Sequence, residues 1–280
     1  MKKTIYIFLS IIMFLVSCKK EEKKHFYIFN GKKIDYKLIK SNKDSSFING
    51  YGGKIYPNGN LEYLALFSDG KVVDSLFYYY ENGNVREKGL MKNKKRNSWW
   101  IYFHKNGKLN KKIEWFQLNG KVLKNQEIYF DEKGNIKKEP SYYFDVLIPD
   151  TLKVGQNISR INNYVSNLNN IDTRYLSVII ENIYSESKVR NDTFSDGSSS
   201  PFFVINSNKI GKKIIEGKIE EKVLKTDLIN KDSTTLTIID QYRFFRKEVY
   251  VAEKHNESEM EKYIKSEFEK MIKKINSNNR

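Results

Sequence analysis

Between residues 50 and 139 the chain alternates short apolar segments with regularly spaced turn signals. The glycines at positions 59, 83, 107 and 134 are 24, 24 and 27 residues apart, and secondary turns fall between them at 69–71, 93–95 and 119–121. Asn-Gly and Asp-Gly pairs tolerate the positive φ of type I′ turns, whose twist matches that of paired strands. The pattern predicts an antiparallel meander of hairpins built from an internal repeat.

Aromatic residues recur at equivalent positions of this repeat, and all three tryptophans of the chain lie in it. Aromatic pairs across neighbouring strands stabilise a sheet, so we expect aromatic ladders there. The candidate binding residues are Trp99, Trp100, Tyr102, Trp115 and Phe116.

The unit aromatic-aromatic-x-x-Asn-Gly-Lys-hydrophobic resembles the variant MORN repeat of bacterial envelope lipoproteins. The resemblance implies a repeat sheet over residues 27–140, in which Asn30-Gly31-Lys32 and a strand from Ile34 to Ile39 form a degenerate leading unit. The sequence departs from the pattern at Asn93-Lys94, where the usual glycine is missing.

After Pro140 the turn period stops, and residues 141–255 are expected to form a second domain. Its alternating segments predict an antiparallel β-sandwich, and Ile148–Gly155 resembles the opening strand of immunoglobulin-like or transthyretin-like modules. Helical spacing of Ile158, Ile161, Val165 and Leu168 predicts a short helix in place of one strand, and 191–198 is expected to be a polar loop. The strands are expected at Tyr175–Ile183, Phe202–Asn206, Lys213–Lys225, Thr234–Ile239 and Tyr242–Ala252.

Residues 256–280 change to a helical period, with Ser258 and Glu261 as a capping box. Packing of the apolar stripe on the sandwich is the simpler interpretation, and a membrane-surface or coiled-coil role is the alternative. The stripe consists of Met260, Tyr263, Ile264, Phe268, Met271, Ile272 and Ile275. The fold class expected for the whole chain is therefore all-β, with a repeat meander, a β-sandwich and a C-terminal amphipathic helix.

The amino-acid composition argues against nucleic-acid binding and against a metal centre. Although the formal charge is +16, only eight of the 50 basic residues are Arg, the side chain best suited to phosphate and guanine, so no nucleic-acid partner is expected. One cysteine and three histidines make a metal centre improbable. No metal site and no cofactor are expected.

The N-terminus carries an export signal. Lys2 and Lys3 precede an apolar run from Ile5 to Val16 that is short for a permanent membrane span. It ends in Leu-Val-Ser-Cys18, which resembles the lipobox of bacterial lipoproteins. The resemblance implies a signal peptide over residues 1–17, acylation of Cys18 and a membrane partner reached through this lipid anchor.

Residues 18–26 are expected to form a charged tether. Within it, Lys-Glu-Glu at 20–22 resembles the surface-export signal of Bacteroidetes lipoproteins. The expected location is the cell envelope, as an outer-membrane lipoprotein facing the periplasm or the cell surface.

Catalytic motifs are weak throughout. Ser68 and Lys71 have the serine-x-x-lysine spacing of penicillin-recognising enzymes but lie on a predicted hairpin turn instead of a helix, and no histidine has a Ser or Cys partner context. No catalytic residue is assigned, and the chain is expected not to be an enzyme.

The leading hypothesis is a lipid-anchored envelope protein whose repeat sheet is a non-catalytic binding or scaffolding surface for an envelope protein or glycan. The alternatives are an envelope hydrolase with a site assembled between the two domains and an antitoxin-like regulatory repeat protein.

Overall fold

The computed structural model describes residues 26–35, 38–41, 49–169, 171–185, 188–230, 233–254 and 256–278. The expected signal peptide, Cys18 and the tether up to residue 25 lie outside these described residues, and Phe26 already belongs to the first strand. The strands are β1 (Phe26–Phe29), β2 (Lys32–Asp35), β3 (Lys40–Ser41), β4 (Gly50–Ile55), β5 (Leu61–Ser68), β6 (Lys71–Tyr79), β7 (Val85–Lys92), β8 (Lys95–Phe103), β9 (Leu109–Leu118), β10 (Lys121–Phe130), β11 (Ile136–Leu147), β12 (Thr151–Lys153), β13 (Gly155–Val165), β14 (Thr173–Ser185), β15 (Lys188–Phe194), β16 (Phe202–Ser207), β17 (Gly211–Asn230) and β18 (Ser233–Ala252), followed by helix α2 (Glu259–Asn278).

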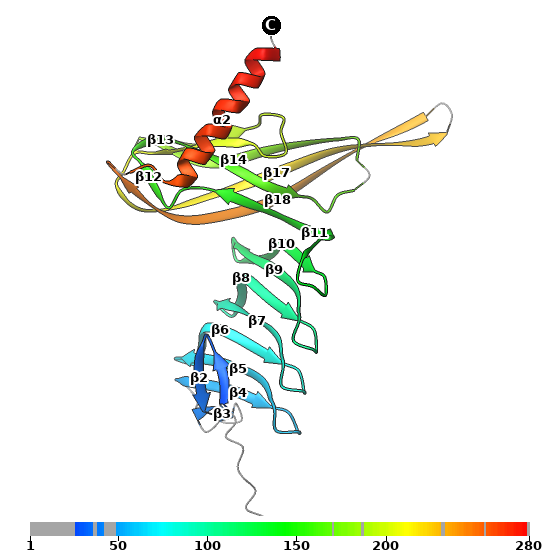
Figure 1. The fold of residues 1–280 in the computed structure, drawn as a ribbon, viewed down its shortest axis with the longest axis vertical. Helices are drawn as coiled ribbons and strands as arrows, with labels where there is room; N and C mark the ends of the chain where they lie inside the picture. The colour runs from blue at the N-terminus through cyan, green and yellow to red at the C-terminus, as the bar shows by residue number, and fades with distance from the viewer. Residues whose placement is uncertain are drawn as a thin grey trace, which may run out of the picture.

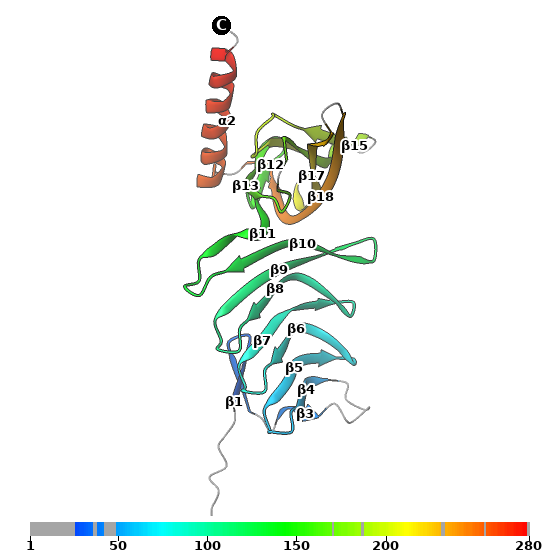
Figure 2. The ribbon, with the colours of Figure 1, turned by 90° about the vertical axis from the view of Figure 1, so that its right-hand side faces the viewer.

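The protein is all-β with one C-terminal helix, as the sequence predicts. Strands β4 to β11 follow one another as an antiparallel meander, here called the repeat sheet, which rises as a single layer below the second domain (Figures 1 and 2). The second domain packs the three strands β11, β13 and β16 against a five-stranded sheet of order β12-β18-β17-β14-β15. The two-layer sandwich is thus present, and its immunoglobulin-like or transthyretin-like type stays a prediction.

Strand β11 belongs to both domains. Its first half pairs with β10, and its second half, from Tyr143 to Leu147, pairs with β13. The expected boundary between residues 140 and 141 therefore lies inside a strand. Because hydrogen bonding is continuous through β11, strand β3, the repeat sheet and the β11-β13-β16 layer of the sandwich form a single sheet of eleven strands.

The turns of the repeat sheet fall into two classes, whereas the sequence predicts one. The pairs Asp69-Gly70, Asn93-Lys94 and Asn119-Gly120 have positive φ at both residues, as type I′ turns require. Lys94, at φ 61°, adopts this conformation without being a glycine. The second class, at Gly59, Gly83, Gly107 and Gly134, has three-residue loops with positive φ only at the glycine, which is the geometry of a type I turn followed by a G1 bulge.

The first three of these loops stack on one another, so the sequence repeat has a counterpart in the structure. Tyr56 donates its hydroxyl to the carbonyl oxygen of Tyr79 at 2.9 Å, and Tyr80 donates to that of Phe103 at the same distance. The side-chain amides of the loop asparagines add a second rung, since 58 and 60 both donate to the carbonyl of residue 81, and 82 and 84 both donate to that of residue 105. Each contact joins positions 21 or 23 residues apart, so the sequence period fixes the rise from one loop to the next.

Gly83→Val is expected to lower the free energy of unfolding by about 1–3 kcal/mol because a β-branched residue is strained at φ 86°. Space is not limiting, since a Cβ there would meet only the Asn60 side chain at 3.8 Å. Gly83→Asn is the matched control, because Asn adopts the left-handed region far more readily than Val. Chemical denaturation of both variants measures the difference, and equal losses would contradict backbone strain as the cause.

The first hairpin does not join the repeat sheet. Strands β1 and β2 form their own two-stranded sheet, and Phe29 and Ile34 are buried with Leu61, Leu64 and Phe77 on one face of the repeat sheet. The expected leading repeat unit is therefore wrong. Its Asn30-Gly31 turn forms as expected, but the hairpin crosses the sheet as a cover over the first strands (Figure 1).

Three sequence predictions for the second domain are wrong. Residues 155–165 form strand β13 instead of a helix, residues 191–194 belong to strand β15 instead of a loop, and the two strands expected between 234 and 252 are the single strand β18. The helical spacing is misleading because its members share no buried face: Ile161 lies in the core, whereas Ile158 and Val165 are only partly buried. In β13 the buried residues are 157, 159 and 161, which is the alternation of a strand.

Helix α2 begins as predicted. The backbone N–H of Ser258 donates to the Glu261 carboxylate at 2.9 Å, and the N–H of Glu261 donates to the Ser258 hydroxyl at 3.2 Å, which is a capping box. The helix packs on the sandwich through buried Ile264 and an edge contact of Phe268 with Phe202. The C-terminal half projects away from the sandwich (Figures 1 and 2).

Candidate functional site

The five predicted binding residues separate onto two faces of the repeat sheet. Trp100, Tyr102 and Trp115 lie on one face, and the alternation of side chains along a strand places Trp99 and Phe116 on the other. Trp100 is fully buried, so its ring is not open to a ligand, and Phe116 is 8% exposed. Trp99, Tyr102 and Trp115 are partly exposed.

The aromatic cluster on the first face is filled by a cation of the protein itself. The Arg96 guanidinium lies 4.1 Å from the Trp100 ring centre and 5.7 Å from those of Tyr102 and Trp115. Arg96 also donates to the Glu87 carboxylate at 2.8 Å and to the Tyr102 hydroxyl. An aromatic cage of this kind holds cationic ligands in other proteins, but here it holds Arg96 and stabilises the sheet.

Phe116 leads to the second candidate site, which lies where the repeat sheet meets the sandwich. Its ring stacks on Phe244 of β18 with centres 5.5 Å apart, and the Arg246 guanidinium lies 5.1 Å from the Phe116 ring centre. Sequence reasoning selected Phe116 but not its partners, because they lie more than 120 residues further along the chain.

A buried asparagine joins the two domains at this point. Asn125 stands at a register shift between β9 and β10 and is 2% exposed. Its side-chain carbonyl accepts the backbone N–H of Phe244, and its amide donates to the backbone carbonyl of Phe244, both at 2.7 Å. The side chain therefore satisfies the edge of β18 as a neighbouring strand would.

Glu114 binds the side chain of Asn125. The contact of Asn125 with Glu114 and Phe244 is called the joint below. Its Oε2 accepts hydrogen bonds from Asn125 at 2.6 Å and from Gln126 at 2.7 Å, and Gln126 in turn accepts the backbone N–H of Phe144. Burial raises the pKa of Glu114 above its ordinary value, although the two amide donors act in the opposite direction.

The raised pKa gives a testable pH dependence. The folded state binds the Glu114 proton more tightly than the unfolded state, so this group's contribution to stability is greatest at low pH and falls as the pH rises from the ordinary carboxyl pKa through the raised one. Glu114→Gln keeps an acceptor for both amides and removes the charge. We expect the variant to gain stability relative to wild type as the pH rises through that window.

Denaturation curves from pH 4 to pH 8 measure this difference. Glu248→Gln, which removes a carboxylate with a 66% exposed side chain, is the control and should show no such trend. A stability difference between Glu114→Gln and wild type that stays constant over the pH range would contradict burial of the carboxylate in the joint.

A groove of ≈ 420 Å³ opens beside this joint. Its lining is mainly apolar and includes four charged side chains, Glu181, Lys213, Glu216 and Lys218. Burial lowers the pKa of Lys213, whose ammonium donates to the backbone carbonyl of Asn206 at 3.2 Å. The groove is lined by Phe116, Leu118, Ile179, Glu181, Ile183, Asn191, Lys213, Ile214, Glu216, Gly217, Lys218, Phe244 and Phe245.

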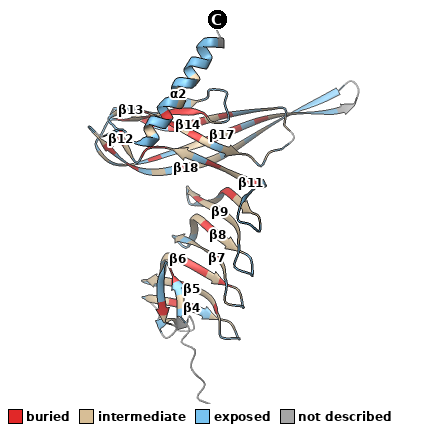
Figure 3. Ribbon diagram, viewed as in Figure 1, coloured by how far each residue is buried: buried red, intermediate tan, exposed pale blue. Residues whose placement is uncertain are grey.

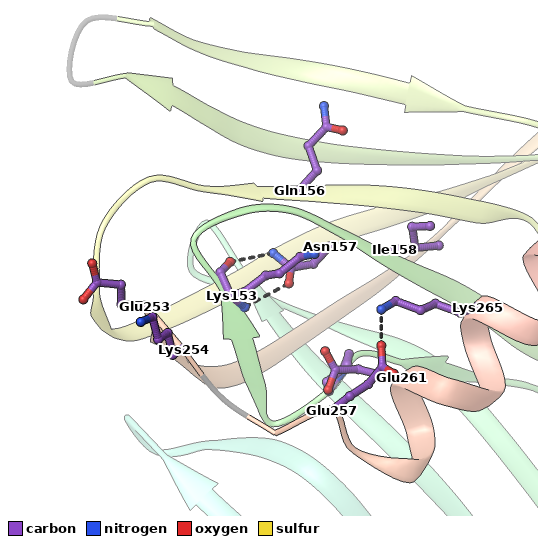
Figure 4. A pocket seen from close by; sticks show the side chains of 10 residues that line it. Lys153, Gln156, Asn157, Ile158, Glu253, Lys254, Glu257, Glu261 and Lys265 are labelled. Carbon is purple, nitrogen blue, oxygen red and sulfur yellow. Dashed lines mark hydrogen bonds and ion pairs between the residues drawn. The ribbon is translucent and has the colours of Figure 1, made fainter.

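A second pocket, of ≈ 370 Å³, lies between the β12–β13 turn and the start of α2 (Figure 4). Two of its carboxylates have partners, since Glu257 pairs with Lys265 and Glu261 completes the helix cap. Asn157 closes the turn by accepting the N–H of Lys153 at 3.0 Å and donating to its carbonyl at 2.8 Å. These contacts hold the helix and the turn in place, and they leave the interdomain groove as the stronger candidate binding site.

Comparisons with known proteins add no name to this site. No protein-family model matches the chain, and no curated protein or solved structure matches it either. Within the described ranges, no group of three or more His, Cys, Asp and Glu side chains could hold a metal ion. In the same part of the chain, no helix combines the length and apolar character needed to cross a membrane.

Proposed function

We propose that this protein is a lipid-anchored, non-catalytic binding protein of the cell envelope, with a repeat sheet of MORN-variant type as a spacer. The observation that carries the binding role is the groove at the domain joint. Interfaces between domains are preferred places for ligand sites, and a mainly apolar lining with a few charged groups is their usual composition.

The groove favours an apolar group of a partner protein over a glycan. Sugars bind to exposed aromatic faces, but Phe116 is covered by Phe244 and Arg246. The open part of the lining is aliphatic, with Ile214 57% exposed and Ile179 and Ile183 beside it. Burial of these side chains by a partner would be favoured by the hydrophobic effect.

Chemical cross-linking on whole cells, followed by purification of the full chain, tests the binding role. Wild type should enrich a partner over an unrelated lipoprotein, and Ile214→Glu should remove that partner by placing a charge in the groove. Val73→Glu is the matched control, because Val73 is 53% exposed on the repeat sheet away from the groove. Recovery of the same partner with Ile214→Glu would refute the groove as its binding site.

The lipid anchor is tested separately. Cys18→Ala is expected to release the protein from membranes, because acylation of Cys18 is the proposed means of attachment and stable anchoring needs more than one acyl chain. Membrane sedimentation and detergent partitioning measure the change. Continued sedimentation of Cys18→Ala with the membrane fraction would refute the anchor but would leave the groove untouched.

A further inference from the structure

Strands β17 and β18 extend well beyond the rest of the sandwich as a two-stranded hairpin (Figures 1 and 3). The last pairing of β17 with β14 joins Leu224 to Thr173, whereas β17 and β18 remain paired as far as Asn230 and Ser233. Residues 225–230 and 233–238 are called the arm below. A hairpin that lacks a third strand or a covering helix is marginally stable in water, so the arm lacks the support that the rest of the sheet has.

One face of the arm is apolar. The register pairs Leu224 with Ile238, Thr226 with Leu236 and Leu228 with Thr234, which places these six side chains on the same face. Leu228 is 78% exposed, Leu236 59% and Ile238 57%. On the opposite face the register pairs polar residues, Lys225 with Thr237 and Asp227 with Thr235.

The outer edge of β18 is open along the arm. Among the described residues, β18 has two neighbours besides β17. Strand β12 pairs with it at Tyr250–Ala252, and the side chain of Asn125 binds the main chain of Phe244. Because both main-chain groups of Phe244 point to Asn125, the even-numbered residues of β18 direct their N–H and C=O groups to the outer edge. Thr234, Leu236 and Ile238 therefore present unpaired main-chain groups there.

This open edge carries no charge. Residues 233–239 read Ser-Thr-Thr-Leu-Thr-Ile-Ile, in a chain of which 30% is charged. Strand β15, the edge strand at the other end of the same sheet, carries the charged residues Lys188, Arg190 and Asp192. Proteins protect free edges with charges, so an uncharged, β-branched edge indicates a strand that pairs with another chain.

We propose that the occupant of this edge is the arm of a second copy of the chain, paired antiparallel about a twofold axis at Thr237. An isologous contact needs a segment that complements itself, and an uncharged segment meets its own copy without like charges in opposition. This register sets Leu236 opposite Ile238 of the second copy and Asp240 opposite Thr234. The exposed apolar faces of both arms then form one continuous surface over four strands, which a hairpin alone cannot provide.

The oligomeric state of the full chain in detergent tests the contact. Sedimentation equilibrium of wild type should show a concentration-dependent dimer, and Leu236→Lys should weaken its dissociation constant by about tenfold or more. Val73→Lys, which places the same charge at an exposed site on the repeat sheet, should leave the dimer unchanged. A monomeric wild type, or a dimer unaffected by Leu236→Lys, would overturn the proposal.

Cysteine cross-linking tests the register in the same full chain with Cys18→Ala. Thr237 faces its own copy at a non-hydrogen-bonded position, where the Cα atoms are about 4.5 Å apart and a disulfide can form. Mild oxidation should therefore convert Thr237→Cys into a covalent dimer. Thr235→Cys, on the same face of the arm but opposite Ile239 of the second copy, should cross-link poorly. Equal yields at the two positions, no covalent dimer, or capture of a different protein at position 237 would each contradict the arm-to-arm contact.

Discussion

Gly89→Val is expected to lower the free energy of unfolding by about 3 kcal/mol, near the upper end of overpacking effects. Gly89 lies opposite Trp100 in the neighbouring strand, and a Cβ at this glycine would come within 2.4 Å of the indole ring. The ring cannot move aside easily, because it is fully buried and its Nε1 donates to the carbonyl of Leu90 at 2.9 Å. Displacing it would also disturb Arg96, which stacks on its face.

Urea denaturation of the full chain measures this effect, with Leu90→Val as the matched control. Leu90 is the next residue and is 42% exposed, so the same β-branched side chain should change stability there by only about 0.5 kcal/mol. Gly89→Ala should lie between the two variants and remains useful if the valine variant does not fold. Similar stabilities of Gly89→Val and Leu90→Val would mean that Trp100 does not rest on Gly89.

Asn125→Ala is expected to lower the free energy of unfolding by about 2–4 kcal/mol. The substitution leaves the backbone N–H and C=O of Phe244 without the partner that holds them at the joint, and it removes one of the two amide donors to Glu114. Unpaired buried polar groups each cost about 1–3 kcal/mol. Since the joint connects the repeat sheet to β18, the two domains should also unfold with less cooperativity.

Asn84→Ala provides the comparison for Asn125→Ala. Asn84 also donates its side-chain amide to a backbone carbonyl, that of Lys105, at 2.8 Å, but at an exposed loop where water can replace it. Its loss should cost about 0.5–1 kcal/mol. Thermal unfolding followed by near-ultraviolet circular dichroism measures both variants, and a loss for Asn125→Ala no larger than that for Asn84→Ala would contradict a buried joint.

The turns and the alternating pattern could be predicted from the sequence because they depend on one or two residues each. Asn93-Lys94 was assigned as a turn without a glycine, and both residues have positive φ in the structure. The capping box of Ser258 and Glu261 is equally local. The all-β class follows from the same local signals repeated along the chain.

The candidate site could be predicted only in part, because its geometry depends on residues far apart in the sequence. Their aromatic character marks Trp100 and Tyr102 as candidates, but it is the position of Arg96 that makes them packing residues. Phe116 was selected for the same reason, and only its contact with Phe244 places it at a groove. The sequence carried no local signal for Asn125 or Glu114.

The turns of the repeat sheet are written in the local sequence, because backbone conformation at a turn is set by steric limits within a few residues. Other features of the fold depend on contacts between distant segments. Pairing with β11 and β16 makes residues 155–165 a strand despite their apparent helical pattern, and the crossing of the β1–β2 hairpin covers one face of the repeat sheet. The hydrogen bonds between Asn125 and Phe244 span 119 residues of chain, and long-range contacts of this kind leave no periodic trace in the sequence.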